Sequence, residues 1–212
     1  MHLLILEFIN NMKMFLQNLF LKKSALSCVV FLCGLLFLSV LIPFISPHKQ
    51  DIYGAVHFEK AGQPPSFSHW FGTDTAGRDM LTITIRAGFY SLKVAFGVVF
   101  FSVLIGVPIG MLAGVSSKRI DEIIMRITDG FLAFPPLILP IAITAALGSS
   151  LNNVIIGISI SWFPWYVRIA RSQALIISSL DYVSISRSMG AGKLYVIKTH
   201  ILPNSISPCL LY

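Results

Sequence analysis

Charged residues are scarce in this chain of 212 residues: Asp, Glu, Lys and Arg together make up 12% of it. An ordinary soluble domain carries about 25% of these residues, whereas hydrophobic residues here reach 55%. This balance excludes a typical soluble domain and indicates a membrane protein. The net charge of +7 does not predict nucleic-acid binding. The basic residues lie between long apolar runs and form no basic face with interleaved aromatics.

Cysteine is also rare, and its placement predicts no metal site. Cys28 and Cys33 lie in the first apolar run and Cys209 lies near the C-terminus, with no CxxC or Cys/His cluster at metal-ligand spacing. We expect buried, inert thiols. No polar constellation occurs at one depth of the apolar runs, so we predict no catalytic residues and no bound cofactor. A membrane enzyme is excluded on that basis.

Four long apolar runs predict membrane-spanning helices. The first, residues 25–45, has no charged residue and is long enough to cross a hydrocarbon core of about 30 Å. We interpret it as a retained helix, because a cleaved signal peptide has an apolar region of only about 7–15 residues. The other runs cover about 91–115, 123–147 and 154–167. The sequence therefore predicts an all-α, polytopic membrane protein.

The lysines and arginines predict the topology. Most of the 16 lie in compact segments at residues 1–24, 118–126 and 168–198, and fewer lie in the long polar segment 46–90 and its edge. Positive residues favour the cytoplasmic side. We therefore predict an amphipathic, cytoplasmic N-terminus at 1–24 and a periplasmic segment at 46–90.

Small residues and prolines mark the predicted helices. Gly106, Gly110 and Gly114 are spaced by four, which places them on one helix face where another helix can approach closely. Pro135, Pro136, Pro140 and Pro164 predict kinks or interruptions of the helices. Two motifs have plain structural interpretations. Asp74 is expected to cap a helix, with Arg78 one turn on, and Arg126 is expected to pair with Asp129 at i, i+3.

Trp162, Trp165 and Tyr166 are expected to be interfacial anchors, with a role in the substrate path as the alternative.

The stretch "SRSMGAGKLYVIKTHILPN", residues 186–204, contains a GAGK string that resembles a phosphate-binding loop. A Walker A loop requires G-x-x-x-x-G-K-[ST] after a strand, but here Arg187 occupies the first glycine position and Leu194 the Ser/Thr position. The apolar spacing of Tyr182, Ile185 and Met189 instead predicts a short helix. Glycines end it, and a second helix ends at Pro203. From the residues alone, docking on a partner and lying on the membrane surface are equally good interpretations.

Three blocks in the chain resemble binding-protein-dependent ABC importer permeases. They are "HWFGTDTAGRDMLTITIRAGFYSLKVAFG" at 69–97, "MRITDGFLAFPPL" at 125–137, and a cytoplasmic loop with Gly190 and "HILPN" at 200–204. The subfamily resembled is the second permease of dipeptide, oligopeptide and nickel importers. The resemblance implies a type I importer transmembrane domain at 91–212, with about four of six helices present and a coupling loop at 175–204.

The resemblance also implies the site residues. The ATPase-coupling loop would comprise Tyr182, Val183, Ser184, Ile185, Ser186, Arg187, Ser188, Met189, Gly190 and Ala191. The family signature residues would be Gly72, Thr73, Asp74, Gly77, Arg78, Asp79, His200, Leu202, Pro203 and Asn204. Ser184, Ile185 and Ser186 replace the family's Glu-Ala-Ala, which removes an acidic contact.

The implied function is import of peptides across a bacterial inner membrane, with nickel as the alternative substrate. The implied partners are a second permease subunit, two ATPase subunits that use ATP and Mg²⁺, a periplasmic solute-binding protein and membrane lipid, with no nucleic acid. Apolar character resumes after Pro203 before the chain stops at Tyr212, which predicts a C-terminally truncated product. A non-functional remnant and an ATPase-independent channel are the alternatives from other classes.

Overall fold

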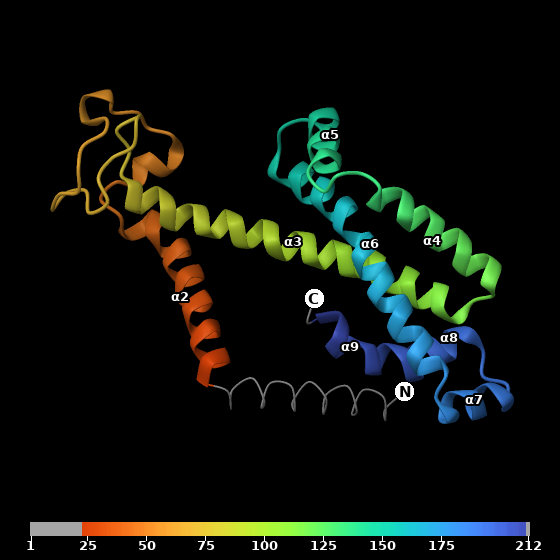
Figure 1. Ribbon diagram of the computed structural model, residues 1–212. Coiled ribbons are helices and arrows are strands. Elements are labelled where there is room, and N and C mark those ends of the chain that lie inside the picture. The colour runs from red at the N-terminus through yellow and green to blue at the C-terminus, as the bar shows by residue number, and fades with distance from the viewer. Residues whose placement is uncertain (1–22, 211–212) are drawn as a thin grey trace. The chain divides into compact units, whose positions relative to one another are not determined.

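The computed structural model describes residues 23–210, and helices dominate it (Figure 1). The α-helices are α2 (Lys23–Ile45), α3 (Met80–Val115), α4 (Lys118–Leu132), α5 (Ile138–Leu147), α6 (Leu151–Ser178), α7 (Asp181–Ser188), α8 (Lys193–Val196) and α9 (Leu202–Leu210). Two 3₁₀ turns, η1 (Lys49–Tyr53) and η2 (Phe58–Lys60), and a π-helical turn, η3 (Ile197–Ile201), complete the order. Within residues 23–210 the only strand-like pairing is an isolated bridge between Thr73 and Asp79, so the all-α prediction is confirmed there.

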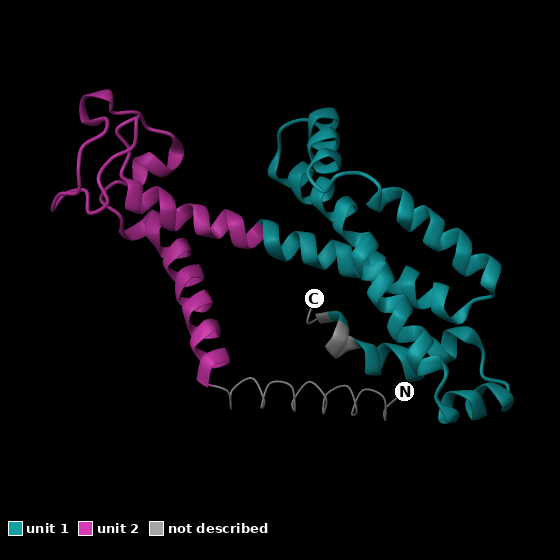
Figure 2. Ribbon diagram, viewed as in Figure 1, with its two compact units in different colours: residues 1–8, 94–212 teal, residues 9–93 magenta. Residues whose placement is uncertain are grey.

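The described residues divide into two compact units, which are 94–210 (unit 1, teal in Figure 2) and 23–93 (unit 2, magenta). Helix α3 contributes its beginning to unit 2 and the rest to unit 1. Among the described helices, α2 and α3 are long and apolar enough to cross a membrane. The amphipathic helix predicted for the N-terminus falls mostly on residues 1–22, outside the described part.

In unit 2, a polar junction joins α2 to the beginning of α3. Pro43 lies inside α2 and has no N–H to donate to the carbonyl of Ser39 one turn earlier. Arg86 of α3 donates from Nη1 to that carbonyl at 3.2 Å. The Ser39 hydroxyl, fully buried, donates to Ile85 O at 2.6 Å. The interhelical contact thus supplies the hydrogen bond that the proline removes.

In unit 1, α3 packs closely against α6 through the glycines spaced by four. A Cβ atom on Gly106 would lie 2.6 Å from Phe163 O, and one on Gly114 would lie 2.6 Å from Ala174 Cβ. Gly110 faces the backbone of α6 at Val167 in the same way. The predicted close-approach face is therefore confirmed, and α6 is the helix that approaches.

Several helix boundaries differ from the predicted ones. Helix α3 begins at Met80, well before residue 91, and α6 extends to Ser178, beyond residue 167. The single helix predicted over 123–147 is wrong, because α4 ends at Leu132 and α5 begins at Ile138. Pro135 and Pro136 lie in the gap, where missing N–H donors and the clash with the preceding residue interrupt the helix.

Two ion pairs hold α4 against α6. Arg171 of α6 binds both carboxylate oxygens of Asp121, at 2.5 and 2.6 Å, and Arg168 contacts Asp129 at 2.6 Å. The predicted Arg126–Asp129 pair is therefore wrong. Asp129 faces α6, and a longer-range partner on that helix reaches its carboxylate.

These two pairs should differ in their effect on stability. The Asp121 side chain is 17% exposed and its contact is bidentate, whereas Asp129 is 54% exposed. We expect Asp121→Asn to lower the free energy of unfolding by about 1.5–3 kcal/mol. Asp129→Asn should change it by less than about 1 kcal/mol. Thermal unfolding in detergent measures both, and equal effects would contradict this ranking.

The cysteine prediction is only partly right. Cys209 is buried, but Cys28 and Cys33 are exposed on α2. Helix α2 carries apolar residues on all sides, so the apolar run did not identify which face is buried.

Candidate functional site

The predicted coupling loop forms a short helix with a fixed exit. Helix α7 (Asp181–Ser188) is anchored by Val183, which is fully buried. After it, Gly190 takes a φ of +93°, a conformation that glycine adopts without steric cost. The N–H of Gly190 donates to Arg187 O at 2.9 Å, and that of Ala191 donates to Ser186 O at 3.1 Å. The turn predicted at Gly190 is present.

One side of this loop is apolar and exposed. Met189 is 84% exposed, and Tyr182, Ile185 and Leu194 each keep roughly half or more of their area exposed. We call these four residues the apolar loop face. Single exposed apolar residues are ordinary, but a group of them on a short helix and its turn is typical of a docking surface.

His200 connects α7 to the segment that follows it. Its Nε2 lies 3.2 Å from Ser186 Oγ, and its ring contacts the rings of Tyr182 and Tyr195 at 5.5 and 5.9 Å between centroids. The resemblance identified His200 only as part of a signature. No spacing rule pairs it with Ser186, so sequence reasoning missed this contact.

The remaining loop residues make local contacts. Arg187 Nη2 donates to Ser178 Oγ at 3.2 Å, which ties α7 back to the end of α6. The hydroxyl of Ser188 donates to Ser184 O at 3.0 Å. Ser184, Ile185 and Ser186 leave α7 without an acidic group on its middle turn.

The helix end predicted at Pro203 is wrong. The chain continues from α8 through η3 into α9, with Pro203 in the first turn of α9. Proline is tolerated in a first turn, and the wide π turn just before it changes the hydrogen-bond register. Asn204 Nδ2 donates to His200 O at 2.7 Å, which satisfies a carbonyl of that turn.

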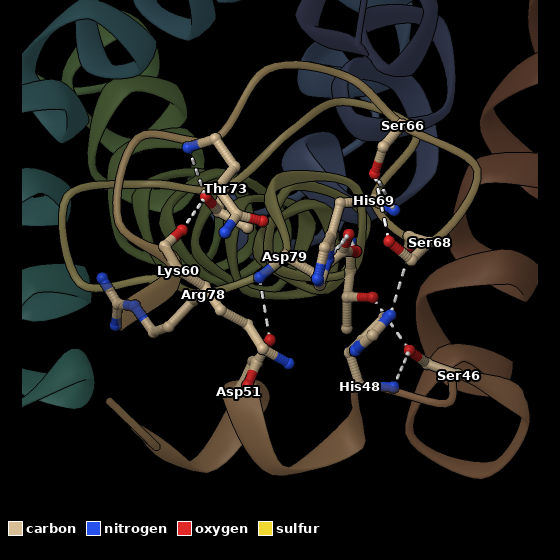
Figure 3. Close-up of polar contacts among 12 residues, drawn as sticks. Ser46, His48, Asp51, Lys60, Ser66, Ser68, His69, Thr73, Arg78 and Asp79 are labelled. Carbon is tan, nitrogen blue, oxygen red and sulfur yellow. Dashed lines mark hydrogen bonds and ion pairs between the residues drawn. The ribbon is translucent and has the colours of Figure 1, made fainter. Parts of the chain in front are cut away.

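A second polar cluster occupies residues 46–79 (Figure 3). Asp74 Oδ1 accepts the backbone N–H groups of Ala76 and Arg78, both at 2.9 Å, and Oδ2 lies 2.7 Å from Arg78 Nη2. Asp74 thus closes a local turn. The backbone N–H of Arg78, followed by its guanidinium, holds the pKa of Asp74 below its ordinary value.

The helix cap is Asp79 and not Asp74, so the predicted cap is wrong. Helix α3 begins at Met80, and Asp79 Oδ2 accepts the N–H of Thr82 at 2.8 Å. Burial of Asp79 opposes ionisation, but hydrogen bonds from Thr82 and His69 outweigh it and lower the pKa of this carboxyl. Two aspartates near a helix start match the same capping pattern, and only one sits at the boundary.

Backbone pairing around the signature glycines holds the cluster together. The N–H of Thr73 donates to Gln63 O at 3.0 Å, and that of Met80 donates to Gly72 O at 3.1 Å. Gly72 and Gly77 have φ values of +72° and +77°. A Cβ atom on Gly77 would overlap the backbone carbonyl of His57. The signature glycines are therefore sites of close backbone approach.

Trp162 and Trp165 line a cavity of about 250 Å³ where the α4–α5 break meets α6. Pro135 and Pro136 contribute to the same lining, whereas Tyr166 is buried toward α3. The three aromatics therefore do not act as one group, and their predicted anchoring role stays a prediction.

Comparisons with known proteins agree with this architecture. Residues 106–212 match the family described as "Binding-protein-dependent transport system inner membrane component". The chain is 37% identical, over 90% of its length, to the probable D,D-dipeptide transport system permease protein of Escherichia coli. It is 34% identical over 90% of its length to the dipeptide transport system permease protein of Alkalihalophilus pseudofirmus, and 31% identical over 91% to the glutathione transport system permease protein of Pectobacterium atrosepticum. It spans 64%, 62% and 64% of these relatives, respectively.

Proposed function

Since this chain belongs to the family of binding-protein-dependent transport system inner membrane components, we propose that it is one of two permease subunits of an ABC importer for short peptides. The names of its relatives, which include dipeptide and glutathione permeases, support this substrate class. A bacterial inner membrane is the proposed location, with the N-terminus and the α7 loop facing the cytoplasm.

The observation that carries the proposal is the apolar loop face, which extends from α7 through Met189 to Leu194 of α8. A short helix of eight residues cannot bury this face against itself. Docking in a groove of a cytoplasmic ATPase subunit would cover Tyr182, Ile185 and Met189 in the way that helix-in-groove recognition uses apolar anchors at i, i+3 and i+7. ATP and Mg²⁺ would act in the ATPase subunits, and this chain would perform no covalent chemistry.

The proposed mechanism transmits motion through contacts that the chain provides. Force on α7 reaches α6 through the Arg187–Ser178 hydrogen bond and reaches η3 through the Ser186–His200 contact. The close glycine contacts would transmit a movement of α6 to α3. The two ion pairs would transmit it to α4. A movement of the loop would therefore be shared by three helices, as alternating access requires.

Gly190 and Gly192 offer a matched test. An added Cβ meets nothing within 4 Å at either position, but only Gly190 has a positive φ. Gly190→Ala should strain the exit of α7 by about 1–2 kcal/mol. We expect it to reduce co-purification with the ATPase subunits and peptide uptake by roughly 5–30-fold. Gly192→Ala should leave both unchanged.

Uptake of labelled dipeptide by cells expressing the complete importer measures the effect, with labelled nickel as the competing substrate. ATP-dependent peptide uptake that is insensitive to Gly190→Ala would contradict the coupling role alone. Nickel uptake without peptide uptake would contradict the substrate class. Flux through the chain in the absence of ATPase subunits would favour a channel.

A further inference from the structure

Three potential metal ligands from distant sequence positions meet in the 46–79 cluster (Figure 3). His48, His69 and Asp79 each offer one ligand atom, and these atoms lie within 4.8 Å of one another. His69 Nδ1 is 3.1 Å from Asp79 Oδ1, and the rings of His48 and His69 are 4.4 Å apart between centroids. His69 and Asp79 are only 4% and 3% exposed, while His48 is half-buried.

We infer that His48, His69 and Asp79 form a binding site for one divalent first-row transition-metal ion of the Zn²⁺ class. Two imidazole nitrogens and one carboxylate oxygen suit such ions, whereas Mg²⁺ and Ca²⁺ prefer all-oxygen sites. Three protein ligands leave a fourth position for water or for a donor group of another molecule. The sequence predicted no metal site, because these ligands share no recognisable spacing.

The distances fit a tetrahedral ion after a small adjustment. Bonds of about 2.0–2.2 Å place neighbouring ligand atoms roughly 3.3 Å apart, close to the observed 3.1 Å between His69 and Asp79. The widest separation of 4.8 Å requires a shift of roughly 1.5 Å to reach that spacing. The half-buried His48 ring, on the short connection between α2 and η1, is the ligand able to move.

Neighbouring groups already orient the three ligands. His48 Nε2 lies 2.9 Å from Ser68 O, and an Nε2–H donated to that carbonyl leaves Nδ1 with a free lone pair for the ion. The N–H of Thr82 occupies Asp79 Oδ2, which leaves Oδ1 for the ion. For the ion to bind His69 Nδ1, the ring must be the neutral tautomer that carries its proton on Nε2, so the ion takes the place of the hydrogen bond to Asp79 Oδ1.

Asp51 and His57 lie beside the proposed site but are not among its ligands. Asp51 Oδ2 accepts the backbone N–H of Asp79 at 2.8 Å, and Asp51 Oδ1 lies 3.4 Å from His57 Nε2. A bound ion would fix the end of α2, the loop at His69 and the start of α3 to one another. All three ligands lie within residues 46–79, apart from the α7 loop on which the proposed transport function rests.

The test uses the tag-free full chain in detergent, with Co²⁺ as the spectroscopic probe and Zn²⁺ as the competitor. We expect one Co²⁺ per chain with a tetrahedral visible spectrum, displaced by Zn²⁺. His48→Gln should weaken binding by at least about 100-fold, since even loss of a group behind a ligand costs 10–100-fold. His57→Gln, a neighbouring histidine outside the ligand set, should bind as the wild type does.

A second measurement covers the case in which His48→Gln disturbs folding. Saturating Zn²⁺ should raise the unfolding temperature of the wild type and of His57→Gln, because an ion that binds only the folded state stabilises it. Failure of the wild type to bind Co²⁺, or equal binding by His48→Gln in a folded state, would overturn the site. So would an unfolding temperature that does not respond to Zn²⁺.

Discussion

Gly110→Ala should destabilise the contact between α3 and α6 by about 3 kcal/mol. The added Cβ would overlap Val167 O and lie 2.8 Å from Ala170 Cβ. Both neighbours are fully buried, and one of the overlapping atoms is backbone, so the helices must move apart. Overpacking of this kind costs typically 1–3 kcal/mol. The expected readout is a lower unfolding temperature in detergent, followed by intrinsic tryptophan fluorescence.

Gly130→Ala is the matched control for this substitution. Gly130 lies inside α4, and a Cβ atom there meets nothing within 4 Å. Alanine in an unobstructed helix interior stabilises by roughly 0.5–1 kcal/mol relative to glycine. The two substitutions should therefore shift the unfolding temperature in opposite directions. A neutral Gly110→Ala would show that the helices do not pack as closely as the structure has them.

Gly77→Ala should open the polar cluster at 46–79. Gly77 has a φ of +77°, and its added Cβ would overlap the carbonyl carbon and oxygen of His57. The N–H of His57 donates to Ala76 O, next to Gly77, at 2.7 Å. The two backbone segments therefore cannot move apart without losing that hydrogen bond. We expect the free energy of local opening to fall by at least about 3 kcal/mol. Hydrogen exchange and protease cleavage within 46–79 measure it.

Gly62→Ala separates the two causes of that effect. Gly62 also has a positive φ, of +65°, but nothing lies within 4 Å of its added Cβ. It should cost only the backbone strain of roughly 1–2 kcal/mol. If both variants open the cluster equally, steric overlap at Gly77 is not the cause. If neither does, the close approach of His57 is wrong.

The sequence predicted the parts of this protein that depend on local pattern. The apolar run at 25–45 and the glycines at 106, 110 and 114 follow from length and spacing, and α2 and the α3–α6 contact agree with them. The prolines at 135 and 136 predict a kink or an interruption, and the structure has an interruption. Two consecutive prolines remove two donors, and here they separate α4 from α5.

The incorrect predictions concern side chains with more than one possible partner, where the partner in the structure is distant in sequence. Asp129 could have paired with Arg126 on its own helix, but Arg168 on α6 reaches it. Asp74 and Asp79 both match a helix cap, and which one caps depends on where the chain pairs with Gln63 and Asp51. His48 and His69 are 21 positions apart in sequence, and their rings meet through the fold of residues 46–79, where His48 Nε2 also lies 2.9 Å from Ser68 O. Spacing along the chain carries no information about such contacts.

The junction of Pro43, Ser39 and Arg86 makes two residues far apart in sequence energetically coupled. The proline leaves a backbone acceptor on α2, and the arginine on α3 is the donor that satisfies it. Without Arg86, that carbonyl would lose its partner in a largely apolar setting; without Pro43, α2 itself could provide the donor. The cost of losing Arg86 should therefore be smaller when residue 43 has an N–H, a non-additivity that only a double-mutant cycle reveals.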